Sequence, residues 1–335
     1  MTRRVAAVDC GTNSLRLLVA DVDPELAELT DVARRMEIVR LGQGVDKTGR
    51  LAPQALERTL GVLQHYADII SGAAADAVRM VATSATRDAD NAVEFTRRVK
   101  EVLGVAPEVL TGREEAMLSF AGATAELATR PDRGPCLVAD IGGGSTEFVL
   151  GPATALPADP ARSAVQAISV NIGCVRMTER HLRGDPPAAA EIAAARADID
   201  AALDTVADTV PVRKARTLVG LAGSVTTVAA IAMGLPHYDA ARIHHARVPA
   251  RQVHEVTVGL LAKTRAARAR IGVMHPGRVD VIGGGALILD RIMARFGFTE
   301  VLVSEHDILD GIAWSLASEP DGRHEAPRRR VGRAR

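Results

Sequence analysis

The chain has 335 residues, of which 47% are hydrophobic, so it can bury a sizeable core and is long enough for two domains. Lysine plus arginine balances aspartate plus glutamate at 41 each, and aromatic residues are only 2%, which disfavours a nucleic-acid or membrane partner and base-stacking surfaces. The cysteines, Cys10, Cys136 and Cys174, have no CxxC spacing, which argues against a disulfide framework and for a reducing compartment.

Strand and helix patterns alternate along the first third of the chain. Strands are predicted at residues 3–9, 15–22, 36–41 and 77–83. Residues 53–71 carry apolar side chains at helical spacing. A further helix is predicted over 91–104, with a capping box of Asn91 and Glu94 at its start and Gly104 at its end. Residues 107–112 close this alternation and lead into another helix, so an α/β fold is favoured.

Two stretches share one plan, "VAAVDCGTNSLRLLVA" (5–20) and "CLVADIGGGSTEFVLG" (136–151). In each, an apolar strand ends in an aspartate, a turn of glycine and hydroxyl residues follows, and a second strand returns. Both are predicted to be β-hairpins, with Asp9 and Asp140 in matching places. Coincidence between two glycine turns is the alternative, but the match extends into the flanking strands. We therefore expect a duplication that produces two related α/β domains facing each other.

The later elements continue the pattern. Residues 151–164 are rich in proline and alanine and are predicted to be a loop, and a long helix is predicted over 188–210. The segments 217–231 and 279–297 each indicate a strand, a glycine turn and a helix. The tail 319–335 carries six arginines and no apolar periodicity, so we expect it to be disordered, with a functional basic tail as the alternative.

The two hairpin turns have the composition of a phosphate-binding site. Glycine lets backbone N–H groups approach phosphate oxygens closely, and serine and threonine hydroxyls add donors. The candidate ligands are Gly11, Thr12, Asn13 and Ser14 in the first turn, and Gly142, Gly143, Gly144, Ser145 and Thr146 in the second. Two such turns facing each other across a cleft would hold a phosphate chain from both sides.

Carboxylates accompany both turns. Asp140 and Glu147 flank the second turn, and Asp9 precedes the first. Bare acids would repel a phosphate, but Mg²⁺ between them reconciles the charges, because Mg²⁺ prefers a few carboxylates, several waters and phosphate oxygens. The alternative for Asp9 is a turn-forming acid.

One glutamate and one arginine lie between the hairpins in the sequence. Thr111 and Glu114 form a predicted capping box, whereas Glu115 falls on the small-residue face of the helix, where it is predicted to be exposed. Glu115 is either a surface residue favoured by the helix dipole or a general base aimed into a cleft. Arg87 follows a strand end and is either a bidentate phosphate ligand or a surface arginine paired with Asp88 or Asp90.

Four motifs in order, "DCGTNS", "ATSATRDADN", "LTGREEAMLSFAGA" and "DIGGGSTEFVLG", resemble the exopolyphosphatase and guanosine pentaphosphate phosphohydrolase (Ppx/GppA) family. The resemblance runs from about residue 5 to about residue 316. It implies two ribonuclease-H-like (actin-like) domains with a cleft between them. The implied domains are residues 1–124 and 125–304, with a helix at 305–318 that packs back on the first domain, and the tail at 319–335 lies outside both.

The resemblance also implies chemistry. It suggests hydrolysis of terminal phosphoanhydride bonds of inorganic polyphosphate, with Glu115 as catalytic base and Asp140 and Glu147 as metal carboxylates. Asp9, in the matching place of the first hairpin, is added to the metal site from the sequence pattern. Arg87 and the two turns would bind phosphate. Mg²⁺ is the implied metal, with Mn²⁺ as an alternative and K⁺ as a further candidate. The family suggests a homodimer, and the role of Asp310 stays open because many relatives have arginine at that position.

The sequence is also compatible with other functions. Guanosine pentaphosphate could be the substrate, or nucleotides could act as inhibitors; a binding regulator without turnover and a kinase are further alternatives. The run after Arg3 and Arg4 is too short for a signal peptide and no run approaches the roughly 18 apolar residues of a membrane span, so we expect a cytoplasmic protein. Because the recognisable core ends near Leu316, we expect distributive hydrolysis that favours short chains.

Overall fold

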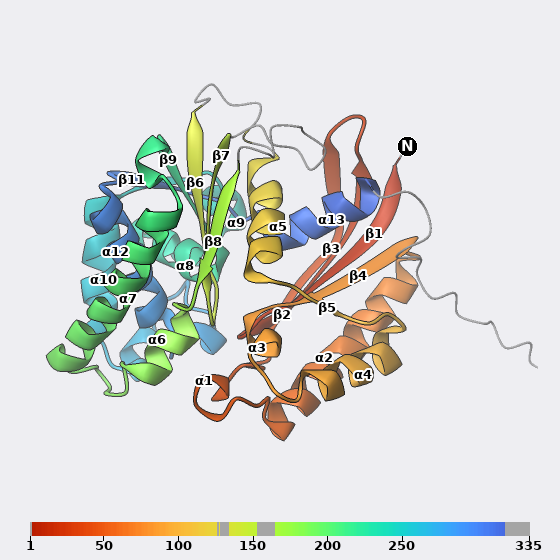
Figure 1. Cartoon of the computed structure of the whole chain (residues 1–335), viewed down its shortest axis with the longest axis horizontal. Coiled ribbons are helices and arrows are strands. Elements are labelled where there is room, and N and C mark those ends of the chain that lie inside the picture. Colours follow the sequence, from red (N-terminus) through yellow and green to blue (C-terminus); the bar gives the residue numbers. More distant parts are fainter. Residues whose placement is uncertain (1, 126, 128–133, 153–164, 319–335) are drawn as a thin grey trace, which may run out of the picture.

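A computed structural model describes residues 2–125, 127, 134–152 and 165–318 of the chain. Two mixed β-sheets with helices around them make up the structure (Figure 1). Among the described residues, none of the helices combines the length and the apolar character needed to cross a membrane. The predicted loop from residue 153 to 164 and the tail 319–335 lie outside the described residues.

The first sheet has the strand order β3-β2-β1-β4-β5. Its strands are β1 (Arg3–Cys10), β2 (Ser14–Asp23), β3 (Glu28–Ile38), β4 (Ala77–Ala82) and β5 (Glu108–Val109). The helices in this part are α1 (Val45–Thr48), α2 (Pro53–Gly72), α3 (Ser84–Arg87), α4 (Ala92–Leu103) and α5 (Gly112–Thr124). Leu63 of α2 and Phe95 of α4 pack with Val8 and Leu17 of the sheet in one buried cluster, so α2 and α4 cover one face.

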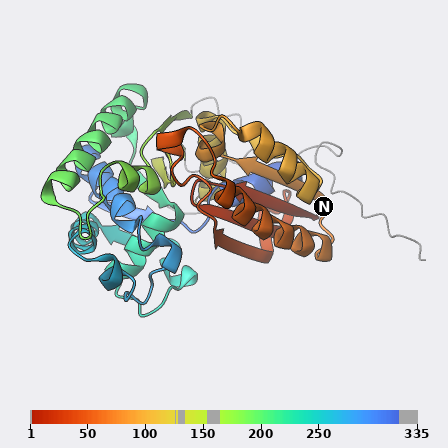
Figure 2. The same ribbon diagram turned by 90° about the horizontal axis from the view of Figure 1, so that it is seen from below.

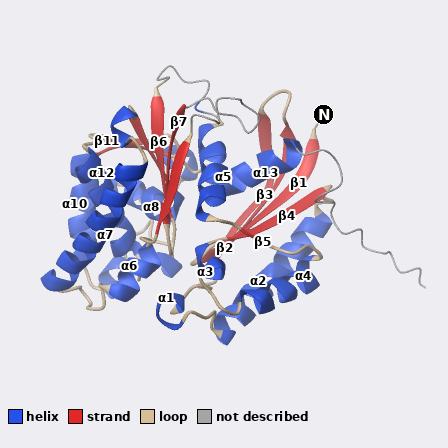
Figure 3. Ribbon diagram, in the orientation of Figure 1, coloured by secondary structure: helices blue, strands red, loops and turns tan. Residues whose placement is uncertain are grey.

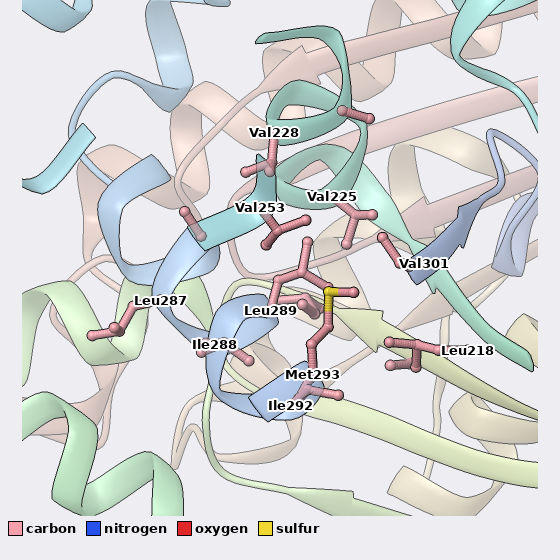
Figure 4. Close-up of a cluster of buried hydrophobic side chains, with 14 of the residues drawn as sticks. Leu218, Val225, Val228, Val253, Leu287, Ile288, Leu289, Ile292, Met293 and Val301 are labelled. Carbon is pink, nitrogen blue, oxygen red and sulfur yellow. The ribbon is translucent and has the colours of Figure 1, made fainter. Parts of the chain in front are cut away.

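The second sheet has the order β10-β11-β9-β6-β7-β8. Its strands are β6 (Pro135–Ile141), β7 (Thr146–Pro152), β8 (Gln166–Val170), β9 (Thr217–Leu221), β10 (Arg247–Pro249) and β11 (Glu300–Val303). The helices are α6 (Cys174–Arg180), α7 (Ala189–Thr209), α8 (Ala222–Ala232), α9 (Ala240–Ile243), α10 (Ala250–Leu261), α11 (Arg265–Arg268), α12 (Ile282–Phe296) and α13 (Ile308–Ser318), with 3₁₀ turns at Val212–Lys214 and Pro276–Arg278. Branched side chains from α8, α10, α12 and the sheet fill the core of this half (Figure 4).

The predicted duplication is confirmed by the pairing of the strands. β1 pairs antiparallel with β2 and parallel with β4, and β6 pairs antiparallel with β7 and parallel with β9. β3 and β8 extend the two hairpins, and β5 and β11 follow in parallel on the other side. The two halves therefore share one topology, with β10 as an added edge strand. Figures 2 and 3 show the two halves side by side.

The helices α5 and α13 lie between the two sheets (Figure 1). Each follows the last parallel strand of its own half and packs on the sheet of the other half. Phe120 of α5 is buried with Val138 and Val149 of the second sheet. Ile312 of α13 is buried with Val5 and other residues of the first sheet. This exchange fixes how the halves face each other.

Three local predictions were wrong. The third strand runs over Glu28–Ile38 rather than 36–41, because its exposed and half-buried residues at the edge of the sheet give no apolar run. Asn91 does not cap α4 with its side chain; its amide exchanges hydrogen bonds with the backbone of Leu51 instead. Residues 279–281 form no strand: the apolar residues there lead straight into α12, whose first turn contains the three glycines.

Candidate active site

The two hairpin turns have the same hydrogen bond. The Gly11 N–H donates to the Ser14 carbonyl at 3.0 Å, and the Gly142 N–H donates to the Ser145 carbonyl at 3.0 Å. The turns also touch, since a Cβ added at Gly143 would lie 2.8 Å from the Thr12 Cβ. Only the absence of a side chain at position 143 allows the two backbones to approach this closely. The cleft between the halves therefore narrows where the predicted phosphate ligands lie.

A cavity of about 90 Å³ opens beside the turns. Its walls include the predicted site residues Asp9, Gly11, Thr12, Asn13, Ser14, Glu115, Asp140, Gly142, Gly143, Ser145 and Glu147. Gly144, Thr146 and Arg87 are not part of this lining. The Thr146 hydroxyl donates to the Ile172 carbonyl at 2.5 Å, and Gly144 packs against Thr12 and Ser84. These two residues shape the second turn, and their predicted contact with phosphate stays a prediction.

Glu115 is buried, with 8% of its surface exposed, so the prediction of an exposed side chain was wrong. The amphipathic pattern failed because α5 lies between two sheets and is buried on most of its circumference. The predicted capping box of Thr111 and Glu114 is confirmed, and it leaves Glu115 as the first-turn acid that points into the cavity. Burial raises the pKa of Glu115 to about 7, against the opposing effect of Arg87.

Arg87 donates a hydrogen bond to the Glu115 carboxylate. Its Nη1 donates to the Glu115 carboxylate at 3.1 Å and to the Leu110 carbonyl at 2.8 Å. The predicted alternative of a surface pair with Asp88 or Asp90 was wrong for Asp88, which pairs with Arg176 at 2.6 Å. Arg87 thus orients the Glu115 carboxylate, and direct phosphate contact by Arg87 stays a prediction.

Asp140 and Glu147 lie opposite each other in the register of β6 and β7. The Ser119 hydroxyl donates to Asp140 at 2.6 Å, and the Ser169 hydroxyl donates to Glu147 at 2.7 Å. Burial, followed by the nearby charge of Asp307, raises the pKa of Asp140 to about 6. Burial and the charges of Glu115 and Asp140 raise the pKa of Glu147. The cavity therefore contains several carboxylates whose charged forms a bound cation would stabilise.

Arg16 is a site residue that the sequence analysis missed. It stands opposite Asp9 in the β1–β2 register, which is the position that Glu147 holds opposite Asp140. Its guanidinium donates to one Asp9 oxygen at 2.8 and 2.9 Å and also pairs with Asp307, which precedes α13. The alignment of the two hairpins contained this signal. Arg16 lines the cavity and joins the first sheet to Asp307, just before α13.

The residues fit a bound Mg²⁺ in one respect. The second oxygen of Asp9, Oδ1, is buried and has no hydrogen-bond partner within the described part of the chain. Within that same part, no three histidine, cysteine or acidic side chains form a closed metal-binding group. Mg²⁺ commonly uses only one or two carboxylates together with waters and substrate phosphates. An open site that is completed by substrate matches this arrangement better than a protein cage.

Asp310, whose role the resemblance left open, is buried in the first turn of α13 and lines neither the cavity nor the hairpin turns. It accepts the Asp307 N–H at 2.9 Å at the start of α13 and pairs with Arg34 of β3 at 2.6 Å. This partly buried pair links α13 to the first sheet.

We expect the metal-free protein to lose stability as the pH rises from about 4 to about 7. The folded pKa values of Glu115 and Asp140 lie above their ordinary values, so the native state holds protons there that the unfolded chain has lost. Their stabilising contribution is complete below pH 4 and disappears as the pH passes through about 6 to 7. Calorimetry in EDTA should give a melting temperature that falls over this window, and Glu115→Gln should flatten the fall. An equal slope in both proteins would contradict the raised pKa of Glu115.

Comparison with known proteins adds to this geometry. The model of the Ppx/GppA phosphatase family matches residues 18–319. The chain is 50% identical over 325 residues to a Mycobacterium tuberculosis protein named Exopolyphosphatase 2, covering 94% of this chain and 98% of that protein. It is 30% identical over 312 residues to an Aeromonas salmonicida guanosine-5'-triphosphate,3'-diphosphate pyrophosphatase, covering 93% of this chain and 59% of that protein. A solved structure of an Aquifex aeolicus PPX-GPPA enzyme superposes with a TM-score of 0.76 at 30% identity, covering 94% of this chain and all of the other.

Proposed function

The chain belongs to the Ppx/GppA phosphatase family, and from that premise we propose that it is an exopolyphosphatase that releases orthophosphate from the ends of inorganic polyphosphate. The observation that carries the proposal is the meeting of two glycine turns in the lining of one cavity together with a buried carboxylate, Glu115. Backbone N–H groups of both turns suit a terminal phosphoryl group, and Glu115 suits the water that attacks it.

In this proposal, different residues bind the phosphate, accept the proton of water and hold the metal ion. The turns and the hydroxyls of Thr12, Ser14 and Ser145 hold the terminal phosphoryl group. Glu115, oriented by Arg87, accepts the proton of the attacking water as the new P–O bond forms and the bridging P–O bond breaks. Asp140 and Glu147, with the open oxygen of Asp9, are positioned to hold Mg²⁺, which when bound would neutralise charge on the phosphate oxygens. Phosphoryl transfer needs mainly positioning and charge stabilisation, so these groups suffice.

The test of the proposed function is orthophosphate release from tripolyphosphate, long polyphosphate and guanosine pentaphosphate, with and without Mg²⁺. Release from polyphosphate supports the proposal. Faster release from guanosine pentaphosphate would favour the activity in the name of the Aeromonas salmonicida relative. Binding of either compound without release would indicate a regulator instead. On long polyphosphate, a ladder of intermediate lengths on a gel is the expected sign of distributive hydrolysis.

Asp140→Asn should weaken the apparent affinity for Mg²⁺ on the order of 10-fold or more, because neutralising a metal-site carboxylate removes a charged ligand. Mn²⁺ binding by electron paramagnetic resonance measures this directly, and the Mg²⁺ dependence of the rate measures it in turnover. Asp200→Asn is the control, since Asp200 pairs with Arg291 outside the cavity lining. Equal metal affinity in Asp140→Asn and the wild type would remove Asp140 from the metal site.

The remaining parts of the proposal concern the cellular setting. We propose a cytoplasmic homodimer, with K⁺ as a candidate activator and nucleotides as candidate inhibitors. Light scattering of the purified chain tests the oligomeric state, and the rate in K⁺ against the rate in a bulky organic cation tests the activator.

A further inference from the structure

A second cavity of about 420 Å³ adjoins the first, between β3 and the start of α8. Arg16, Ala222, Gly223 and Arg278 line both cavities, whereas Glu115 and the hairpin turns line only the first. Attack by water requires the leaving group on the side of the phosphorus away from the water. Because Glu115 lines only the first cavity and Arg278 lines both, a chain that extends away from Glu115 can pass the shared wall and enter the second cavity.

Arg278 is the residue of that wall that lacks a role in the fold. No hydrogen bond or ion pair within the described part of the chain holds its guanidinium, although the side chain is partly buried. Burial lowers the pKa of Arg278, and the nearby positive charge of Arg16 lowers that pKa further. Of the two acids that line the second cavity, Glu305 accepts the hydroxyl of Tyr238 at 2.5 Å and Asp307 pairs with Arg16. The Arg278 guanidinium therefore has no anionic partner among the described residues, and a bound anion could supply one.

The Arg278 guanidinium also packs directly against the backbone of a glycine. It lies over Gly223 so closely that a Cβ there would overlap it. Gly223 is in the first turn of α8, whose N–H groups have no acceptor within the helix. The preceding residue, Ala222, has φ 68, a left-handed conformation that costs energy for a residue with a Cβ. The strained turn brings the helix start and Arg278 to the same side of the cavity wall.

We propose that Arg278 binds the second phosphate of the chain, the leaving phosphate, as the substrate passes from the first cavity into the second. This inference rests on the proposed function and deepens it. When the bridging P–O bond breaks, the electron pair stays on the oxygen of the leaving phosphate. A bidentate guanidinium stabilises that added negative charge, so Arg278 acts in the transition state as well as in binding. The terminal phosphoryl group remains with the turns.

The test separates the two phosphates by ligand. Binding of orthophosphate and of imidotriphosphate, a nitrogen-bridged tripolyphosphate, is measured calorimetrically with Mg²⁺ on the full chain. Arg278→Gln should weaken imidotriphosphate binding by about 10- to 100-fold, as expected for a lost charge-assisted bidentate contact, and orthophosphate binding by less than about threefold. It should lower kcat on tripolyphosphate by a similar factor. Arg278→Lys should recover part of both losses because the charge is kept.

Arg251→Gln is the matched control, because Arg251 is exposed on α10, lines neither cavity and pairs with Glu255 one turn away. Circular dichroism establishes that each variant is folded. Equal imidotriphosphate binding by Arg278→Gln and the wild type would overturn the inference, as would an equal loss for both ligands. If the wild type binds imidotriphosphate but releases no orthophosphate from tripolyphosphate, the proposed function fails, and the binding comparison still decides the role of Arg278.

Discussion

Glu115→Gln is expected to lower kcat on polyphosphate by about 10²–10⁴, the range typical of a lost general base. The amide keeps the size of the side chain and can still accept a hydrogen bond from Arg87, but it cannot take a proton from water. Because the carboxylate lies in the first turn of α5 and is buried in the cavity, solvent cannot easily replace it. Orthophosphate release under saturating substrate and Mg²⁺ measures the effect.

The adjacent acid provides the control. Glu114→Gln changes the same charge one residue earlier, but Glu114 is exposed and accepts from Thr111 in the capping box. Glutamine can still complete the capping box, so only the favourable charge at the helix start is lost; stability should fall by about 0.3–1 kcal/mol and kcat should stay within about threefold. If Glu115→Gln turns over polyphosphate at nearly the wild-type rate while folded, Glu115 is not the base.

The duplicated topology followed from the sequence because both hairpins carry local signals. Glycine and hydroxyl residues at a turn, with apolar strands on each side, predict a hairpin from neighbouring residues alone. The structure has the same turn hydrogen bond in both hairpins, donated by the N–H of Gly11 in one and of Gly142 in the other. In contrast, β3 is an edge strand with half-exposed residues, so its pairing with β2 and not its own pattern determines where it begins.

The site could be predicted only in part, because several of its features depend on contacts between the halves. Glu115 lies on α5, which packs on a sheet whose first strand begins 20 residues later in the sequence, at Pro135. Arg16 acquires its role from Asp307, which is 291 residues away. Arg278 lies against a glycine in another helix. A single sequence gives no measure of such distances, whereas an alignment of the two hairpins would have indicated Arg16.

The helices α5 and α13 pack so closely that a methyl group does not fit between them. A Cβ at Gly122 would overlap the Asp307 carbonyl and lie 2.8 Å from the Gly311 nitrogen. A Cβ at Gly311 would overlap the Leu118 carbonyl and lie 2.7 Å from its carbon. These neighbours are backbone atoms and cannot rotate away as a flexible side chain does. Either helix could accommodate the methyl group only by moving, and each helix is packed on the sheet of the opposite half.

Gly122→Ala is therefore expected to lower the free energy of unfolding by about 3 kcal/mol or more, at the upper end of the range for overpacking. Alanine is otherwise the better helix former, so the sign depends wholly on this contact. Gly61→Ala in α2 is the matched control: nothing lies within 4 Å of its Cβ position, and it should raise stability by about 0.5–1 kcal/mol.

Because α5 also carries Glu115, a shift of this helix away from α13 should displace the base. A displacement of 1 Å can cost about 10²-fold in rate, so Gly122→Ala should lose activity even at temperatures where it is folded. Thermal unfolding and orthophosphate release on the same preparations test both effects, with Gly311→Ala as the reciprocal substitution. If Gly122→Ala is as stable and as active as Gly61→Ala, the two helices do not form the close contact that joins the halves at the site.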